Sequence, residues 1–171
     1  FSNPEAVYLL NKALLKWFFN VNWSLKKGHL CPAVPGRFDY LLHARDLLPK
    51  IEGRRVRMLD VGAGASLIYP LLATAAFNWE CVGSEVDKEA ISCAKGLVRM
   101  NASMMGTRIR RQEFKSQLLQ GIIEKKETFD LLVCNPPFYK TKSEALAANI
   151  RKNKNLHGKE EANHNFGGSA N

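Results

Sequence analysis

The segment VRMLDVGAGASLIYPLLATAAFNWECVGSEV, residues 56–86, decides the fold class. It begins with a strand pattern at 56–61, turns at the glycine-rich stretch 62–66 and continues as an apolar helix pattern at 67–77. A second strand pattern follows at 81–86. A strand, a glycine turn, a helix and a strand in this order are typical of a parallel βαβ unit.

The alternation of strand and helix continues beyond this segment. A helix pattern at 87–100 leads to a strand pattern at 108–112, and a short helix pattern at 118–124 leads to a last strand pattern at 129–134. Four strands separated by helices predict an α/β fold, a three-layer sandwich with helices on both faces of a parallel sheet. Ligands of such sheets bind at the carboxyl ends of the strands, so the residues that follow each strand are candidate site residues.

The residues before this core predict helices. Asn3 and Pro4 are typical of a helix start, because asparagine caps the first turn and proline is tolerated at the first helical position. A loop rich in proline and glycine follows, and a second short helix is predicted at 39–48. We therefore expect an N-terminal helical segment over residues 1–50 and the α/β core over residues 51–171.

Composition limits the class of protein and the class of partner. The chain has 171 residues and a formal net charge of +9, which favours a polyanionic partner such as nucleic acid. No apolar run reaches the ~20 residues of a membrane span, and the first residues lack the features of a signal peptide. The four cysteines lack C-x-x-C spacing and the four histidines form no helical pair, so we expect reduced thiols in a cytoplasmic protein without a metal site.

The glycine loop and the ends of its flanking strands indicate a nucleoside cofactor. Gly62 and Gly64 allow a sharp turn and a close approach of a ligand, whereas Leu67 replaces the third glycine of a dinucleotide fingerprint and disfavours NAD. Glu85 ends the second strand, where a carboxylate usually accepts the ribose hydroxyls. Asp60 can orient an ammonium group and would repel a phosphate. S-adenosyl-L-methionine has a ribose and an amino group and no phosphate; the alternative is a tight turn without a ligand.

The last strand ends in VCNPPFYK, residues 133–140, whose two consecutive prolines stop both strand and helix. The amide oxygen of Asn135 and the carbonyl of Pro136 can accept the two N–H bonds of a planar amine, and Phe138 can stack on its ring. The pattern D/N/S-P-P-F/Y/W after a fourth strand marks the amino-methyltransferases that act on adenine, on cytosine amines or on a glutamine amide. The alternative is a Pro-Pro strand end without a chemical role.

Several blocks together resemble a known family. LCPAVPGRFDY, LDVGAGASLIYP, GSEVD, CNPPF and NFGG are similar in sequence and spacing to the bacterial 23S ribosomal RNA adenine-N6 methyltransferases of the RlmF type. The related eukaryotic enzymes that methylate adenosine in U6 small nuclear RNA share much of this pattern. The resemblance runs from about Asn3 to Gly168. It implies a Rossmann-like class I S-adenosylmethionine-dependent methyltransferase fold.

The resemblance also implies roles for individual residues. The methyl donor would be S-adenosyl-L-methionine, the acceptor N6 of an adenine, and the substrate large-subunit ribosomal RNA. Arg37 matches a family arginine near the cofactor, Ser116 aligns with a hydroxyl residue near its adenine, and residues 1–50 would pack on the cofactor site. The expected cofactor-binding residues are Arg37, Asp60, Gly62, Gly64, Glu85, Ser116 and Asn135; the expected catalytic residues are Asn135, Pro136 and Phe138.

The ends of the chain depart from the family pattern. Family members carry a basic segment before the position of Phe1 and further strands after NFGG. The four strands predicted here cannot complete a seven-stranded methyltransferase sheet. We expect these residues to be a piece of a longer enzyme whose C-terminal strands are missing.

Basic residues flank the predicted site and could contact RNA phosphates. Arginines at 108, 110 and 111 lie on the third strand, where alternation would expose some of them. The alternative is an ordinary solvated charged surface. The expected RNA-binding residues after the NPPF motif are Lys140, Lys142, Arg151 and Lys152.

Other functions share parts of this pattern. A DNA-adenine or protein-glutamine methyltransferase would use the same amide-holding residues, and an RNA-binding module with an inactive methyltransferase fold would share the charge. The basic charge disfavours a protein substrate. The complete set of site residues disfavours an inactive module. We expect a monomer.

Overall fold

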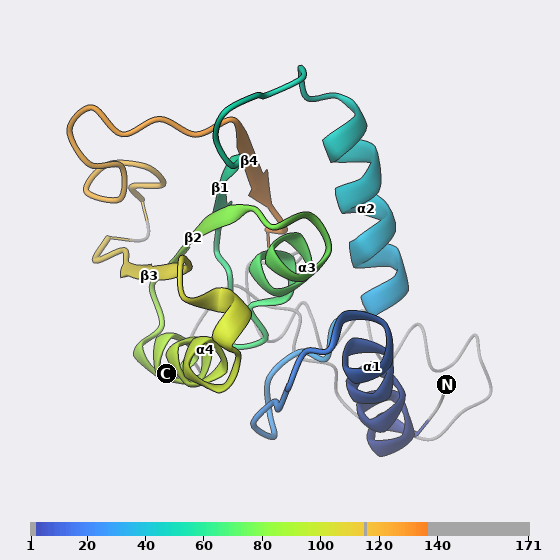
Figure 1. The fold of residues 1–171 in the computed structure, drawn as a ribbon. Helices are drawn as coiled ribbons and strands as arrows, with labels where there is room; N and C mark the ends of the chain where they lie inside the picture. Colours follow the sequence, from blue (N-terminus) through green and yellow to red (C-terminus); the bar gives the residue numbers. More distant parts are fainter. Residues whose placement is uncertain (1–2, 115, 137–171) are drawn as a thin grey trace, which may run out of the picture.

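The computed structural model describes residues 3–114 and 116–136 (Figure 1). Within these residues, four parallel strands form one sheet in the order β3-β2-β1-β4. The prediction of a Rossmann-like α/β fold is confirmed. The elements in chain order are α1 (Pro4–Phe19), α2 (Val34–Asp46), β1 (Arg57–Val61), α3 (Ile68–Phe77), β2 (Glu80–Glu85), α4 (Lys88–Met100), the 3-10 helix η1 (Ala102–Met104), β3 (Arg108–Arg111) and β4 (Leu131–Cys134).

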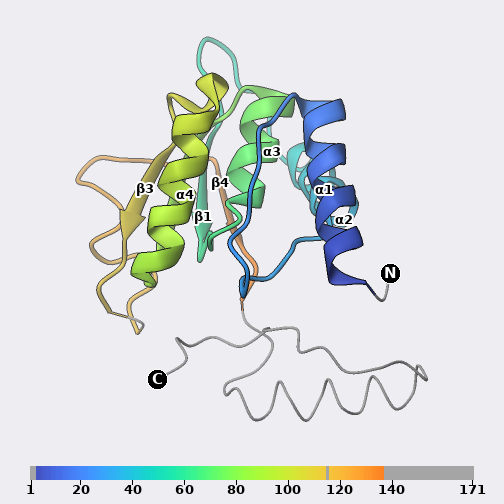
Figure 2. The ribbon, with the colours of Figure 1, turned by 90° about the horizontal axis from the view of Figure 1, so that it is seen from below.

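Among the described residues, the helices lie on one face of the sheet, so the second helical layer of the predicted three-layer sandwich is not seen there. Helices α3 and α4 pack on the strands, and α1 and α2 pack against α3 (Figures 1 and 2). The main core lies between these helices and the side chains of Met58, Cys81 and Val133. Strand side chains alternate in direction, so Leu59 and Val82 point to the opposite face.

A loop covers this opposite face in the part of the chain that the structure describes. Ile122 and Phe129, from the connection between β3 and β4, pack on the strand side chains of that face. The short helix predicted at 118–124 is wrong, because these residues form turns. The physical reason is Gly121, whose φ of +77° cannot belong to a right-handed helix.

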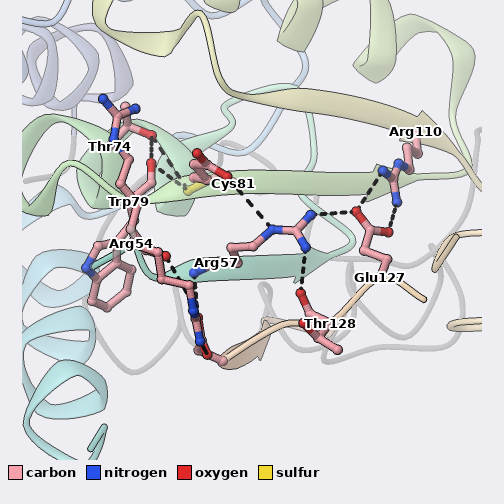
Figure 3. A network of polar contacts seen from close by, with 11 residues as sticks. Arg54, Arg57, Thr74, Trp79, Cys81, Arg110, Glu127 and Thr128 are labelled. Atoms are coloured by element: carbon pink, nitrogen blue, oxygen red, sulfur yellow. Dashed lines mark hydrogen bonds and ion pairs between the residues drawn. The ribbon is translucent and has the colours of Figure 1, made fainter. Parts of the chain in front are cut away.

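An ion-pair network ties this loop to the sheet (Figure 3). Glu127 accepts hydrogen bonds from Arg57 of β1, at 2.8 Å, and from Arg110 of β3. Its side chain is 7% exposed. The hydrogen bonds from Arg110 lower the pKa of Glu127 to about 2, so this carboxylate is charged at neutral pH and holds the loop in place.

Helix α2 begins five residues before the predicted start at Asp39, at Val34. Pro35 favours the first turn of a helix, because its φ is already helical and its missing N–H has no partner there anyway. The cap residue Ala33 has no side-chain oxygen; instead Asn11 of α1 accepts a hydrogen bond from the Val34 N–H, at 3.0 Å. Arg37 therefore lies in the first turn of a helix that α1 holds in place.

The N-terminal residues contact the glycine loop directly. Trp23, which follows α1 and is 2% exposed, donates a hydrogen bond from its indole N–H to the carbonyl of Ser66, at 3.1 Å. The division into a segment over 1–50 and a core over 51–171 stays a prediction. No helix in the described ranges has the length and apolar character needed to cross a membrane.

Candidate active site

The candidate site lies where the strand order reverses, between β1 and β4. In an open parallel sheet this switch point opens a crevice at the carboxyl ends of the strands. Val61 of β1 lies level with both Ser84 of β2 and Cys134 of β4. The residues that follow these positions, the glycine loop, Glu85 and Asn135, are therefore brought to one edge of the sheet.

The glycine loop turns back against the end of β2. Gly62 and Gly64 have φ values of +77° and +64°, which glycine adopts without strain. A Cβ atom added at either residue would meet nothing within 4 Å, so a ligand can approach the backbone closely. The N–H groups of Gly62 and Ala63 both donate to the carbonyl of Ser84, at 2.9 Å. These two amides are occupied and do not form a phosphate cradle.

Backbone amides hold the carboxylate of Glu85. Its Oε2 accepts the N–H of Gly64 at 2.9 Å, and its Oε1 accepts the N–H groups of Val86 and Asp87 at 2.7 and 3.0 Å. An ionised carboxylate has about four acceptor positions, so one remains for a ligand hydroxyl. The side chain is half-buried and fixed before any ligand arrives.

Asp60 is a buried carboxyl without a partner. It is 1% exposed, and neither of its side-chain oxygens has a hydrogen-bond partner among the described residues. Burial raises the pKa of Asp60 to about 8; the negative charge of Glu85 adds to the rise, and the positive charge of Arg37 opposes it. Buried polar groups are nearly always paired, so this carboxyl is suited to a cationic ligand group such as an ammonium.

Asn135 follows β4 and contacts a helix that is distant in sequence. Arg37 Nη1 donates to the Asn135 Oδ1 at 3.1 Å and to the hydroxyl of Tyr69 at 2.9 Å. The Arg37 guanidinium also lies 5.7 Å from the centre of the Tyr69 ring. The structure thus joins α2, the start of α3 and the end of β4 at the site.

Gly83 is a packing residue that sequence reasoning missed. A Cβ atom at this position of β2 would lie 2.9 Å from the Cβ of Ala63 in the glycine loop and 3.4 Å from the Cδ1 of Leu67. Leu67 is fully buried and has a φ of +49°, a backbone conformation that favours glycine. The loop can lie against β2 only because Gly83 has no side chain. A glycine inside a strand pattern is the signal that could have found it.

The sequence analysis did not predict Tyr69 as a residue of the site. Its position just after the glycine loop was a usable signal, because the start of that helix faces the ligand crevice. The hydroxyl is a polar group on a residue that is 5% exposed, and desolvation raises its pKa, so it stays protonated.

Some predicted residues are not brought into this cluster. Ser116 is exposed in the loop after β3, with no hydrogen bond to the site residues described. Pro136 is the last residue of the second described range and is exposed. Arg110 is half-buried in the Glu127 network, whereas Arg108 and Arg111 are exposed. The predicted residues that lie outside the described ranges are Phe138, Lys140, Lys142, Arg151 and Lys152.

No group of at least three histidine, cysteine, aspartate or glutamate side chains suited to a metal ion occurs within residues 3–114 and 116–136. The polar groups at the strand ends instead suit an organic ligand. Asp60 can pair with an ammonium, Glu85 can accept a hydrogen bond from a hydroxyl group, and the open side of Gly62 and Gly64 leaves space for the ligand itself. These residues fit S-adenosyl-L-methionine.

Comparison with known proteins places this site in a family. A family model described as RNA methyltransferase matches residues 1–171. A protein of Christiangramia forsetii named Ribosomal RNA large subunit methyltransferase F is 41% identical over 175 residues, which cover 100% of this chain and 61% of that protein. A protein of Salmonella arizonae with the same name is 42% identical and is covered over 56% of its length. The chain spans about three-fifths of these curated relatives.

Solved structures agree with the sequence matches. The N-terminal domain of human METTL16 in complex with SAH has a TM-score of 0.74 and 29% identity, over 91% of this chain and 64% of that chain. The hMettl16 catalytic domain in complex with the MAT2A 3'UTR hairpin 1 has a TM-score of 0.78 and 32% identity, over 98% of this chain and 55% of that chain. The predicted resemblance is confirmed. The chain belongs to this family of RNA methyltransferases.

Proposed function

We propose that the protein transfers the methyl group of S-adenosyl-L-methionine to the N6 amine of an adenosine in 23S ribosomal RNA. The observation that carries the proposal is the meeting of two kinds of group at one sheet edge. Asp60, Glu85 and the open glycine loop suit the cofactor, and the amide oxygen of Asn135 suits an amine. The names of the relatives from Christiangramia forsetii and Salmonella arizonae support ribosomal RNA as the substrate.

Three groups of the chain would hold the cofactor. The buried carboxyl of Asp60 would pair with the ammonium group, and the fixed carboxylate of Glu85 would accept a hydrogen bond from a ribose hydroxyl. Arg37, which already faces Asn135, would contact the amino-acid portion. When bound, S-adenosyl-L-methionine supplies an electrophilic methyl group on a positively charged sulfur. The SAH bound to human METTL16 is the demethylated form of this cofactor and supports the assignment.

Asn135 would position the acceptor amine. The adenine amine is a weak nucleophile because its lone pair is delocalised into the ring. One N–H of the amine would donate a hydrogen bond to the Asn135 oxygen, and the other N–H would donate one to the Pro136 carbonyl. These two hydrogen bonds would draw the amine nitrogen toward tetrahedral geometry. Asn135 is neutral, so it orients the amine and does not remove its proton. Positioning of this kind can supply about 7–11 kcal/mol of the barrier reduction.

The RNA would present its adenine outside the base stack. Unstacking costs roughly a few kcal/mol, and stacking on the predicted partner Phe138 would return about 1–3 kcal/mol. The hairpin bound to the hMettl16 catalytic domain supports structured RNA as the substrate class. Phosphate contacts are proposed for Lys140, Lys142, Arg151 and Lys152. We further propose a cytoplasmic monomer that needs no metal ion.

One experiment separates this function from its alternatives. Labelled S-adenosyl-L-methionine is offered with ribosomal RNA, with DNA or with protein, and the product is digested and identified. N6-methyladenosine from ribosomal RNA is expected. Label found only in DNA or on protein glutamine would show one of the rival functions. RNA binding without transfer to any substrate would indicate an inactive RNA-binding module.

Two variants of Asn135 test its role in the transfer. Asn135→Ala is expected to abolish transfer and to leave cofactor affinity, measured by calorimetry, largely unchanged. Asn135→Asp keeps an acceptor oxygen and is expected to retain measurable transfer. Full activity of Asn135→Ala would contradict the proposed role.

A further inference from the structure

A single nitrogen of Arg37 connects two helices to the NPPF motif. Nη1 carries two N–H bonds, and its two acceptors, the Tyr69 hydroxyl at 2.9 Å and the Asn135 Oδ1 at 3.1 Å, can use both. The three residues come from α2, α3 and the end of β4. The contact therefore links the cofactor side of the site to the side that would hold the amine.

The Tyr69 hydroxyl has a fixed position. The residue is 5% exposed and lies in the first turn of α3, directly after the glycine loop. Its ring contacts the Arg37 guanidinium on one side and lies 5.4 Å from the Tyr40 ring. Packing on the ring leaves the hydroxyl little freedom, so it can hold Arg37 in one orientation.

Arg37 also starts from a fixed backbone. It belongs to the first turn of α2, and the N–H of Val34 at the start of this helix donates to the buried Asn11 of α1. A guanidinium donates hydrogen bonds and accepts none. The atom of Asn135 that faces Arg37 must therefore be the oxygen and cannot be the amide nitrogen.

We propose that Tyr69 is a positioning residue that acts through Arg37 to fix the side-chain amide of Asn135 with its oxygen toward the site. The oxygen and nitrogen of an asparagine amide differ little in shape, so only a hydrogen-bond partner fixes their orientation. A carbonyl oxygen has two lone pairs, and Arg37 uses one. The second remains for an N–H of the acceptor amine. In the reversed amide, N–H groups of Asn135 would face N–H groups of the amine.

The inference rests on the proposed function and predicts a particular kinetic change. Tyr69→Phe keeps the packed ring and removes only the hydroxyl. Loss of one hydrogen bond that orients the amide is expected to lower kcat with ribosomal RNA about five- to tenfold. The affinity for S-adenosyl-L-methionine, measured by calorimetry without RNA, should change less than about twofold. Tyr8→Phe is the matched control and should leave both quantities unchanged, because that ring packs on Trp23 and has no part in the hydrogen bonds that join Tyr69, Arg37 and Asn135.

A second measurement observes the amide itself. The side-chain NH2 signals of Asn135 in a nitrogen-15 NMR spectrum, assigned by their loss in Asn135→Ala, should shift or broaden in Tyr69→Phe and stay in place in Tyr8→Phe. An unchanged kcat, unchanged Asn135 signals, or a loss of activity explained entirely by weaker cofactor binding would each overturn the proposal. If the unaltered protein transfers no methyl group to RNA, the proposed function fails instead, and the NMR comparison still decides whether Tyr69 orients Asn135.

Discussion

Replacement of Asp60 by asparagine should stabilise the unliganded protein at neutral pH. Asp60 is buried without a hydrogen-bond partner among the described residues, and burial raises its pKa from 3.8 to about 8. In the unfolded chain the carboxyl ionises near its ordinary pKa. Between these two values the folded protein binds more protons at this residue than the unfolded chain. The contribution of Asp60 to stability therefore falls as the pH rises through this window.

The size of the effect follows from the two pKa values. Each pH unit inside the window costs about 1.4 kcal/mol. From pH 4 to pH 7 the loss at Asp60 is therefore about 4 kcal/mol, a large fraction of the ~5–15 kcal/mol stability of an ordinary domain. Asparagine has nearly the same shape and cannot ionise. Asp60→Asn should match the unaltered protein near pH 4 and exceed its stability by about 4 kcal/mol at pH 7.

Urea unfolding followed by tryptophan fluorescence at several pH values between 4 and 8 measures this difference. Other carboxylates titrate in the same range, but they cancel in the comparison of variant with unaltered protein. The same variant should bind S-adenosyl-L-methionine more weakly, because it lacks the charge that would pair with the ammonium. A stability difference that does not vary between pH 4 and pH 8 would refute the reasoning.

Three further outcomes test other parts of the structure. Gly83→Ala places a methyl group 2.9 Å from the Ala63 Cβ and should lower the free energy of urea unfolding by about 1–3 kcal/mol. In the control Gly96→Ala, in α4, the added methyl group meets no atom within 4 Å, and the free energy of unfolding should rise by about 0.5–1 kcal/mol. Equal effects of the two substitutions would contradict the packing of the glycine loop on β2. Glu127→Gln should lower the free energy of unfolding by about 3 kcal/mol at pH 7. The difference between variant and unaltered protein should disappear as the pH falls from 4.5 through about 2. A difference that does not change with pH would show that the charge of Glu127 is unimportant. Binding of S-adenosyl-L-methionine at pH 7 should release about 0.9 proton from Asp60, measurable by calorimetry in buffers of different ionisation enthalpy, and no release would separate Asp60 from the ammonium.

The sheet and its site edge could be predicted from sequence because their signals are local. Each apolar strand pattern spans only a few residues, and the glycines at 62 and 64 directly follow one of them. Parallel strands present their carboxyl ends at one edge, so these patterns also predict where the site lies. Helix α2 was placed too late because its first turn contains Pro35 and Gly36, which resemble a loop. Its start depends on Asn11, a partner in another helix.

The contacts of Arg37 could not be derived from local patterns. Tyr69 lies 32 residues away and Asn135 lies 98 residues away, so only the folded sheet brings them together. Likewise, the burial of Asp60 without a partner depends on the helices that cover its face. Sequence identified which polar groups reach the site edge, and the tertiary structure determines how they are paired.

The contact between Leu67 and Gly83 explains how this loop departs from the dinucleotide pattern. There, a third glycine lets the helix come close to the strand. In this protein Leu67 lies at the start of the helix, and the glycine, Gly83, lies in the neighbouring strand β2. The loop and the strand still approach closely, but it is the strand that lacks the side chain. A glycine at 67 would leave a hole in the core, and a side chain at 83 would still collide with Ala63 of the loop. An evolutionary change of cofactor class at this edge would therefore have to alter more than position 67.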